Sequence, residues 1–128
     1  MQTLTNYLIW QDEILSINAQ RKSMMEVRGL DYDTIKVQSP TSDPMPDLII
    51  TLEKLDLERN RLLRLQDEIL YSLSQMSNKR YSKILAYRYI VGMTWDEIAE
   101  AMDVSPRWSR VLCKRAESRY YSLQDEKN

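Results

Sequence analysis

Apolar side chains recur at alternating steps of three and four residues along much of the chain, which is the spacing of an amphipathic helix. The first stripe of this kind covers residues 4–28. Its apolar positions are Tyr7, Trp10, Ile14, Ile17 and Met24. Gly29 follows directly and is a natural helix stop, because glycine adopts the left-handed backbone that ends many helices. The pattern therefore predicts a first helix over residues 4–28.

A longer stripe predicts a second helix that begins between Asp43 and Asp47 and ends near Met76. Its steps of four and three hold over four heptads, which is typical of a coiled coil. We expect six aliphatic residues to form an oligomerisation surface, and we call them the α-stripe: Leu48, Leu52, Leu55, Leu62, Ile69 and Leu73. A hairpin with the first helix is the alternative. A homodimer is favoured, because the first helix is shorter and less apolar than this stripe requires.

The segment between these helices, residues 29–46, holds three of the four prolines and many turn formers, so we interpret it as a linker. The whole chain of 128 residues has only two glycines, and its β-branched residues do not alternate as strands require. We therefore predict an all-α fold. Residues 1–77 would form a long-helix oligomerisation region, and residues 78–124 a trihelical, helix-turn-helix DNA-binding domain.

Two short helices with strong capping signals follow a third helix that ends before Gly92. Thr94 and Glu97 have the spacing of a capping box, in which each side chain satisfies a backbone amide of the first turn. Ser105 is a strong N-cap, and Pro106 suits the first position of the next helix. A pair of helices around so tight a turn is the arrangement that places the second helix in the DNA major groove.

Charge is distributed in agreement with this reading. Residues 1–78 carry 8 Lys and Arg against 12 Asp and Glu, whereas residues 79–128 carry 10 against 7. The expected recognition helix contains a single acid, Glu117. We expect its DNA-contacting residues to be Arg107, Ser109, Arg110, Lys114, Arg115 and Arg119. An arginine near its start would read guanine edges, and Lys114 and Arg119 suit phosphates. The alternative is a solvated cationic helix in a protein-binding module.

Residues beside this helix allow two interpretations each. Trp95 and Trp108 could stack on bases, but core packing is favoured because indole is a large apolar group. Lys79, Arg80 and Lys83 fit either contacts to the DNA backbone or a plain exposed face.

The order of these motifs resembles region four of bacterial sigma factors. The resemblance rests on the run Leu85–Ile90, the run Trp95–Ala99 and the pair Arg115-Ala116. The whole chain, with its linker and long middle helix, resembles small Gram-positive phage regulators of the RinA and ArpU late-gene activator kind. These resemblances imply promoter binding by a phage or prophage transcriptional regulator, with contact to host RNA polymerase.

Two residues depart from the sigma-factor pattern. Asp103 stands where a turn glycine is usual, and Asp tolerates the left-handed conformation better than most residues. Ser109 stands where a buried Val or Ile is usual, and a buried hydroxyl without a partner costs about 1–3 kcal/mol. Trp108 and Leu112 would then supply the core contact with the helix slightly rolled. In that case Arg107 would replace Arg110 as the residue that reads the bases.

Catalysis and cofactor chemistry are disfavoured. Histidine is absent, and no glycine-rich phosphate loop exists. The one cysteine, Cys113, cannot make an internal disulfide or a zinc site by itself, and it suits the core. We expect no cofactor and no metal. Without a signal peptide or an apolar run of membrane length, the expected location is the host bacterial cytoplasm. Two other functions stay open: a small terminase-like packaging or structural subunit, and an RNA polymerase adaptor that does not read DNA.

Overall fold

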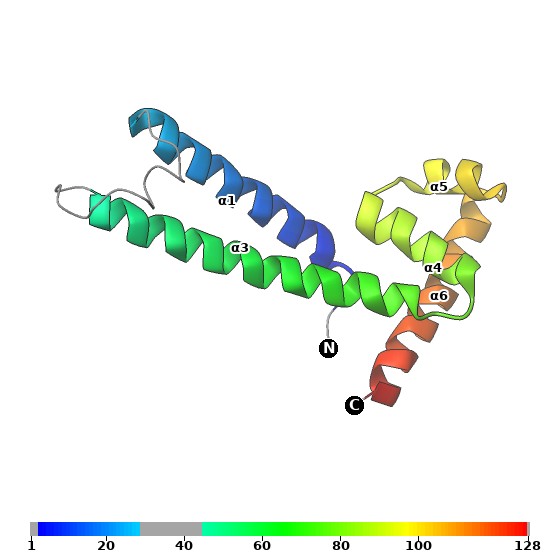
Figure 1. Cartoon of the computed structure of the whole chain (residues 1–128). Coiled ribbons are helices and arrows are strands. Elements are labelled where there is room, and N and C mark those ends of the chain that lie inside the picture. The colour runs from blue at the N-terminus through cyan, green and yellow to red at the C-terminus, as the bar shows by residue number, and fades with distance from the viewer. Residues whose placement is uncertain (1–2, 29–44, 128) are drawn as a thin grey trace. The chain divides into compact units, whose positions relative to one another are not determined.

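Every element that the computed structural model describes, within residues 3–28 and 45–127, is a helix. Their order is α1 (Asn6–Arg28), α3 (Met45–Ser74), α4 (Lys79–Leu85), η1 (Ala86–Val91), α5 (Trp95–Met102) and α6 (Pro106–Lys127) (Figure 1). The all-α fold class is therefore confirmed. The predicted linker at residues 29–46 falls, up to residue 44, outside the described residues.

Contacts divide the chain into two compact units. The first, which we call the hairpin unit, is residues 10–64. The second joins residues 1–9 with residues 65–128, and we call it the terminal unit because it holds both chain ends. α1 and α3 each contribute to both units. The functional division predicted between residues 77 and 78 stays a prediction.

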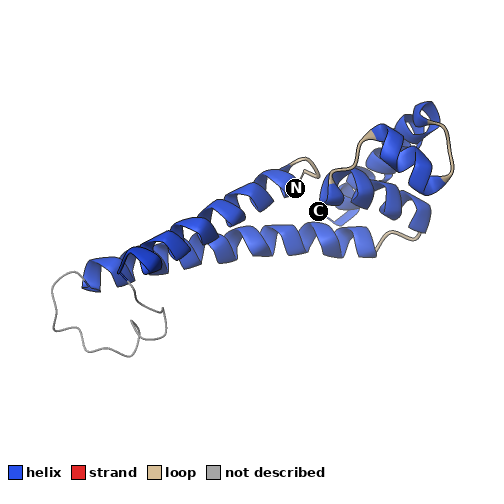
Figure 2. Ribbon diagram, turned by 90° about the horizontal axis from the view of Figure 1, so that it is seen from above, coloured by secondary structure: helices blue, strands red, loops and turns tan. Residues whose placement is uncertain are grey.

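In the hairpin unit, α1 and α3 lie side by side (Figures 1 and 2). Leu48 and Leu52 are buried near the start of α3, and the half-buried Met24 and Met25 pack against them. Removal of these apolar surfaces from water stabilises the pair of helices at about 25 cal/mol per Å². The chain therefore forms the hairpin between α1 and α3, which was the alternative to self-association through the long helix.

Charged residues within the hairpin unit form ion pairs with one another. Arg21 on α1 places Nε 2.8 Å from Oδ1 of Asp56 on α3, and Arg59 reaches the same oxygen at 3.4 Å. The three side chains are 18–25% exposed, so these two ion pairs are less screened by solvent than surface salt bridges. Arg59, which interrupts the apolar stripe, therefore has a partner in its own chain.

The α-stripe is mostly covered within the single chain. Leu48, Leu52, Leu62, Ile69 and Leu73 are each at most 5% exposed, and Leu55 is half-buried. For the five buried residues this corrects the assignment to an oligomerisation surface, because buried side chains cannot meet a second copy unless the helices around them separate. Homodimerisation itself stays a prediction, and it would need another surface.

The terminal unit is built on α6, which packs against both α4 and α5. Its buried apolar side chains include Ile84, Leu85, Ile98, Ala99, Leu112, Cys113, Ala116 and Tyr120. Sequence-distant residues also belong to it, since the Leu4 amide donates to the Tyr121 hydroxyl at 3.1 Å. The Gln66 side chain donates to the Tyr7 carbonyl at 3.2 Å, so this buried polar group is satisfied.

The third helix changes its hydrogen-bond pattern before it ends. Asn78 caps its start by accepting from the amides of Arg80 and Tyr81. Residues Ala86–Val91 then form a π-helical turn, which closes when Gly92 donates to the Tyr87 carbonyl at 3.1 Å. Gly92 has φ of 85°, which L side chains adopt only with strain. The predicted glycine stop is therefore confirmed, while the π-helical turn had no signal in the sequence.

Candidate nucleic-acid interface

The start of α5 is fixed by the predicted capping box. The Thr94 hydroxyl accepts from the Glu97 amide at 3.2 Å, and the Glu97 carboxylate accepts from the Thr94 amide at 3.1 Å. The backbone hydrogen bond from Thr94 lowers the pKa of the Glu97 carboxyl. Two amides that the helix leaves without partners are thus satisfied locally. This holds the first turn of α5, and with it Trp95, in a defined place.

The turn between α5 and α6 has only three residues, Asp103 to Ser105. Asp103 adopts the left-handed conformation, with φ of 57°, and is the sole described non-glycine residue with positive φ. The Val104 amide returns to the Ala99 carbonyl at 3.0 Å, which closes the end of α5. The Ser105 hydroxyl accepts from the Trp108 amide at 3.1 Å and caps α6. Asp103 therefore takes the place of the usual turn glycine, as predicted.

Ser109, the second residue that departs from the sigma-factor pattern, has its buried hydroxyl satisfied by a local hydrogen bond. Ser109 is fully buried, and its hydroxyl donates to the Pro106 carbonyl at 2.6 Å. The helix therefore accommodates a buried serine without leaving its hydroxyl unsatisfied. The inclusion of Ser109 among the DNA-contacting residues was wrong, because a side chain with no exposed surface cannot reach a ligand.

Leu112 is buried as expected, but Trp108 is not a core residue. Its side chain is 40% exposed, and the Arg115 guanidinium lies 5.1 Å from the centre of its ring. The expectation that Trp108 would replace the missing apolar contact was wrong. Since Ser109 itself occupies the core position, no roll of the helix is needed to explain the packing.

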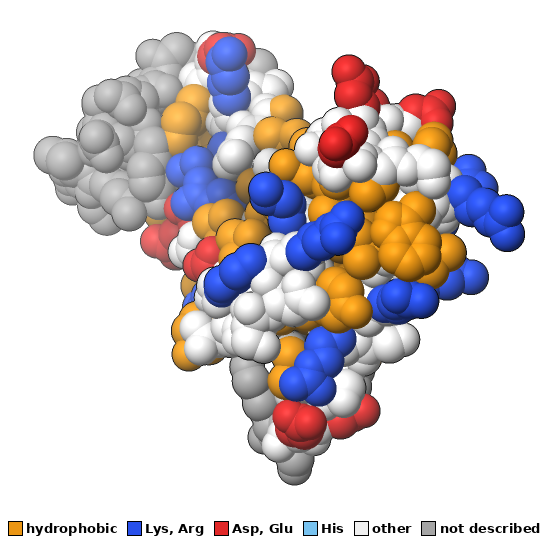
Figure 3. Space-filling model, turned by 90° about the vertical axis from the view of Figure 1, so that its right-hand side faces the viewer, with side chains coloured by type: hydrophobic (Ala, Val, Ile, Leu, Met, Phe, Trp, Pro, Cys, Tyr) orange, Lys and Arg blue, Asp and Glu red, His pale blue; other side chains and the backbone are white. Residues whose placement is uncertain are grey.

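The five cations of α6 that were expected to contact DNA are exposed but do not share one face. Arg107, Arg110 and Lys114 follow one another at steps of three and four, so they line one side of the helix. At 3.6 residues per turn, Arg115 lies about 140° and Arg119 about 180° around the axis from Arg110. Figure 3 shows Lys and Arg side chains gathered beside exposed hydrophobic ones on the side that faces right in Figure 1. We call Arg107, Arg110 and Lys114 the reading face.

Glu117, the single acid expected on this helix, follows Arg110 by seven residues and so lies about 20° from it around the helix axis, but its carboxylate is engaged by neighbouring side chains of the terminal unit. Its carboxylate accepts a hydrogen bond from the Tyr89 hydroxyl, and Oε1 lies 3.6 Å from the Cys113 sulfur. Burial, together with Glu117, raises the pKa of the Cys113 thiol to about 12 and raises that of Tyr89 as well. Both groups are therefore protonated donors at neutral pH. Cys113 is an inert core residue, since a thiol reacts as its thiolate.

Two side chains outside α6 extend the candidate interface. The ring of Trp95 has the Arg88 guanidinium 4.3 Å from its centroid, and the guanidinium of Arg110 lies 5.9 Å from the same centroid. Arg88 also donates to the Met93 carbonyl at 2.9 Å. The sequence carries no signal for this cluster, because its residues lie in η1, α5 and α6 and no single helical period relates them.

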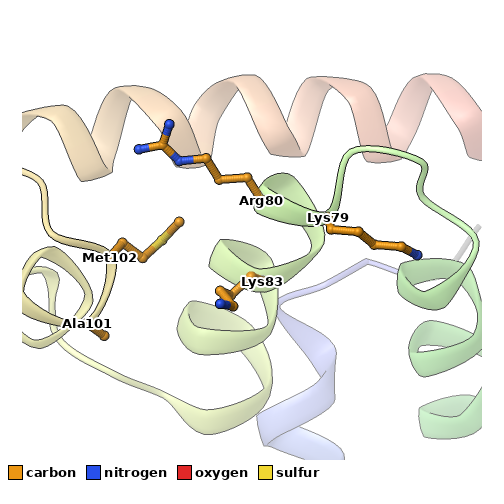
Figure 4. A pocket seen from close by; sticks show the side chains of 5 residues that line it. All are labelled: Lys79, Arg80, Lys83, Ala101 and Met102. Atoms are coloured by element: carbon orange, nitrogen blue, oxygen red, sulfur yellow. The ribbon is translucent and has the colours of Figure 1, made fainter.

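A basic hollow opens where the start of α4 meets the end of α5. Its volume is about 350 Å³, and its lining is Lys79, Arg80, Lys83, Ala101 and Met102 (Figure 4). Lys79 is partly engaged, because its ammonium donates to the Ser74 carbonyl at 3.2 Å. Arg80 and Lys83 make no ion pair with an acid among the described residues. The hollow therefore has the charge and size to accept an anionic group such as a phosphate.

Neither a membrane span nor a metal site occurs in the part of the chain that the structure describes. None of the described helices combines the length and apolar content of a membrane span. In the same residues, no group of three or more His, Cys, Asp and Glu side chains is arranged to hold a metal ion.

Comparison of the chain with protein-family models, with curated proteins and with solved structures finds no match.

Proposed function

We propose that this chain is a phage or prophage transcriptional regulator that binds promoter DNA through α6. The observation that carries the proposal is the combination of a capped α5, a three-residue turn and a second helix with three exposed cations on one side. A helix of this kind, supported from behind by two others, fits the width of the DNA major groove. The sigma-factor resemblance of the same residues supports the same function.

In this proposal the arginines of the reading face contact bases and its lysine contacts a phosphate. Arg107 and Arg110 lie in the first two turns of α6, where a recognition helix approaches base edges. A guanidinium there can donate two hydrogen bonds to O6 and N7 of guanine. Lys114 lies one turn later and suits a phosphate. Arg115 and Arg119 point away from this face, so we assign them no base contact.

The basic hollow supplies further contacts to the DNA backbone in this proposal. Arg80 and Lys83 present positive charge without an acidic partner among the described residues, which is the arrangement that a polyanion favours. Contacts of this kind set orientation and affinity but carry no sequence information. Their expected signature is a dependence on salt that is the same for all DNA sequences.

A second candidate function, an adaptor that binds host RNA polymerase without reading DNA, is favoured by one observation. Trp108 is 40% exposed on the side of α6 that also carries Arg115. Exposed tryptophan and arginine are enriched where proteins bind one another. A regulator that also contacts polymerase would use both sides of α6, whereas a pure adaptor would need only this one.

The experiment that tests the proposal is selection of bound sequences from random double-stranded DNA by the full-length protein, repeated at two salt concentrations. We expect enrichment of one defined site, with the preference maintained at the higher concentration. A site with two-fold symmetry would indicate that a dimer binds. Uniform recovery of sequences, falling steeply with salt, would favour a packaging or structural subunit. Absence of binding at both concentrations would favour the adaptor.

A further inference from the structure

Trp95 is held in place from two directions at the start of α5. It is the first residue of a helix whose capping box is complete. The Arg88 guanidinium lies 4.3 Å from the centre of its ring, within the range of a cation–π interaction, and donates to the Met93 carbonyl at 2.9 Å. A ring fixed in this way can orient a second cation without moving to meet it.

Arg110 is that second cation. Its guanidinium lies 5.9 Å from the same ring centre, near the outer limit of a cation–π contact, and no acid among the described residues pairs with it. Stacking on a ring uses the face of the guanidinium plane, whereas its N–H groups point outward within that plane. The contact with Trp95 therefore orients Arg110 and leaves its donors available for a base edge.

Arg107 differs from Arg110 in this respect. It is exposed on the same reading face, but the described residues give it neither an aromatic nor an acidic partner. An unrestrained arginine loses side-chain entropy when it is ordered on a ligand. Prior ordering by a neighbour reduces that loss on binding. This difference between the two arginines favours Arg110 as the residue that reads a base.

We propose that Trp95 is a specificity-determining positioning residue, which orients the Arg110 guanidinium toward the DNA. The inference deepens the proposed function and rests on it. Trp95 itself touches no base in this account and acts only through Arg110. It differs from Trp108, which has an arginine neighbour of its own, Arg115, on the other side of α6.

Trp95→Leu tests the inference, with Trp95→Phe as the conservative variant and Trp108→Leu as the matched control. All three are compared with the wild-type chain by selection from random DNA and by affinity for the selected site. A cation–π contact at an exposed site corresponds to about a two- to fivefold effect. We expect Trp95→Leu to lose two- to fivefold of the preference at one base position, with unchanged affinity for unrelated DNA. Trp95→Phe should keep most of that preference, and Trp108→Leu all of it.

A double-mutant cycle separates positioning from a structural role. In an Arg110→Ala background, Trp95→Leu should have no further effect on the preference, because the residue through which it acts is gone. A general loss of structure would instead lower the affinity for all sequences and would persist in that background. An additive effect of the two changes would overturn the inference.

A measurement without DNA keeps the test decisive if Trp95→Leu does not fold. In the NMR spectrum of the wild-type protein, the Arg110 side-chain protons should show an upfield ring-current shift that Arg107 lacks. Equal shifts for the two arginines would overturn the inference. If the wild-type protein selects a site and a folded Trp95→Leu variant keeps the same site preference, this inference is overturned but the proposed function is not. A wild-type protein that selects no site would overturn the proposed function and this inference together.

Discussion

Leu52 offers a direct test of how the long helix α3 is used. Its side chain is fully buried in the hairpin unit, whereas Leu57, on the same helix, is 70% exposed. Truncation of a fully buried leucine to alanine costs about 2–5 kcal/mol, from the lost transfer free energy and the cavity that remains. The same change at an exposed position costs within about 0.5 kcal/mol. Leu52→Ala should therefore destabilise the hairpin unit strongly, and Leu57→Ala hardly at all.

Urea unfolding followed by circular dichroism measures both variants. With a urea m-value of about 1–3 kcal/mol per M, the Leu52→Ala midpoint should fall by on the order of 1–2 M. Light scattering at several protein concentrations completes the assay. Because Leu52 packs within its own chain, its truncation should leave the oligomeric mass of the folded protein unchanged. A midpoint equal to that of Leu57→Ala, or a folded protein of reduced mass, would refute the intramolecular packing.

Two further predictions concern the terminal unit. Asp103→Gly should raise the unfolding free energy by up to about 1 kcal/mol, because glycine adopts a φ of 57° without strain. A lower urea midpoint for this variant than for the wild-type protein would contradict the turn geometry. Burial raises the folded-state pKa of Cys113 from its ordinary value near 9 to about 12, so the unfolded chain releases this proton first as pH rises. Stability that is fully present below pH 9 should therefore decline between about pH 9 and 12, and the raised pKa of Tyr89 adds a decline in the same direction above its ordinary value of 10. Urea midpoints at pH 8 and 10.5 measure this decline in stability. The decline should be smaller in Cys113→Ala than in the wild-type protein. Equal declines in the variant and the wild type would exclude the thiol as its source.

The features that the sequence predicted correctly are those that depend on near neighbours. The capping box of Thr94 and Glu97, the left-handed Asp103 and the cap at Ser105 each involve residues within a few positions of one another. Such contacts form whenever the local backbone is helical, so residue type and spacing are enough to predict them. The glycine stop at Gly92 belongs to the same class.

The features that the sequence did not give depend on tertiary packing. A periodic apolar stripe shows that α3 must be covered, but not whether its own chain or a second copy covers it. The hydrogen bond from Leu4 to Tyr121 joins residues at opposite ends of the chain. The contact between Trp95 and Arg110 links α5 to α6. It forms only because each helix is rotated about its own axis so that the two side chains face one another. The burial of Ser109 did have a signal in the sequence, because Ser109 shares a helical spacing with Leu112, Cys113 and Ala116, which are buried.

The most direct test of the central claim compares single replacements on the reading face, at the DNA site that the wild-type protein selects. Arg110→Ala should cost about 1–3 kcal/mol of binding free energy and relax the preference at one base position, as loss of a base-edge contact does. Lys114→Ala should weaken all sequences equally and reduce the salt dependence by about one phosphate contact. If Arg107→Ala and Arg110→Ala both leave site preference and affinity unchanged, α6 does not read the major groove.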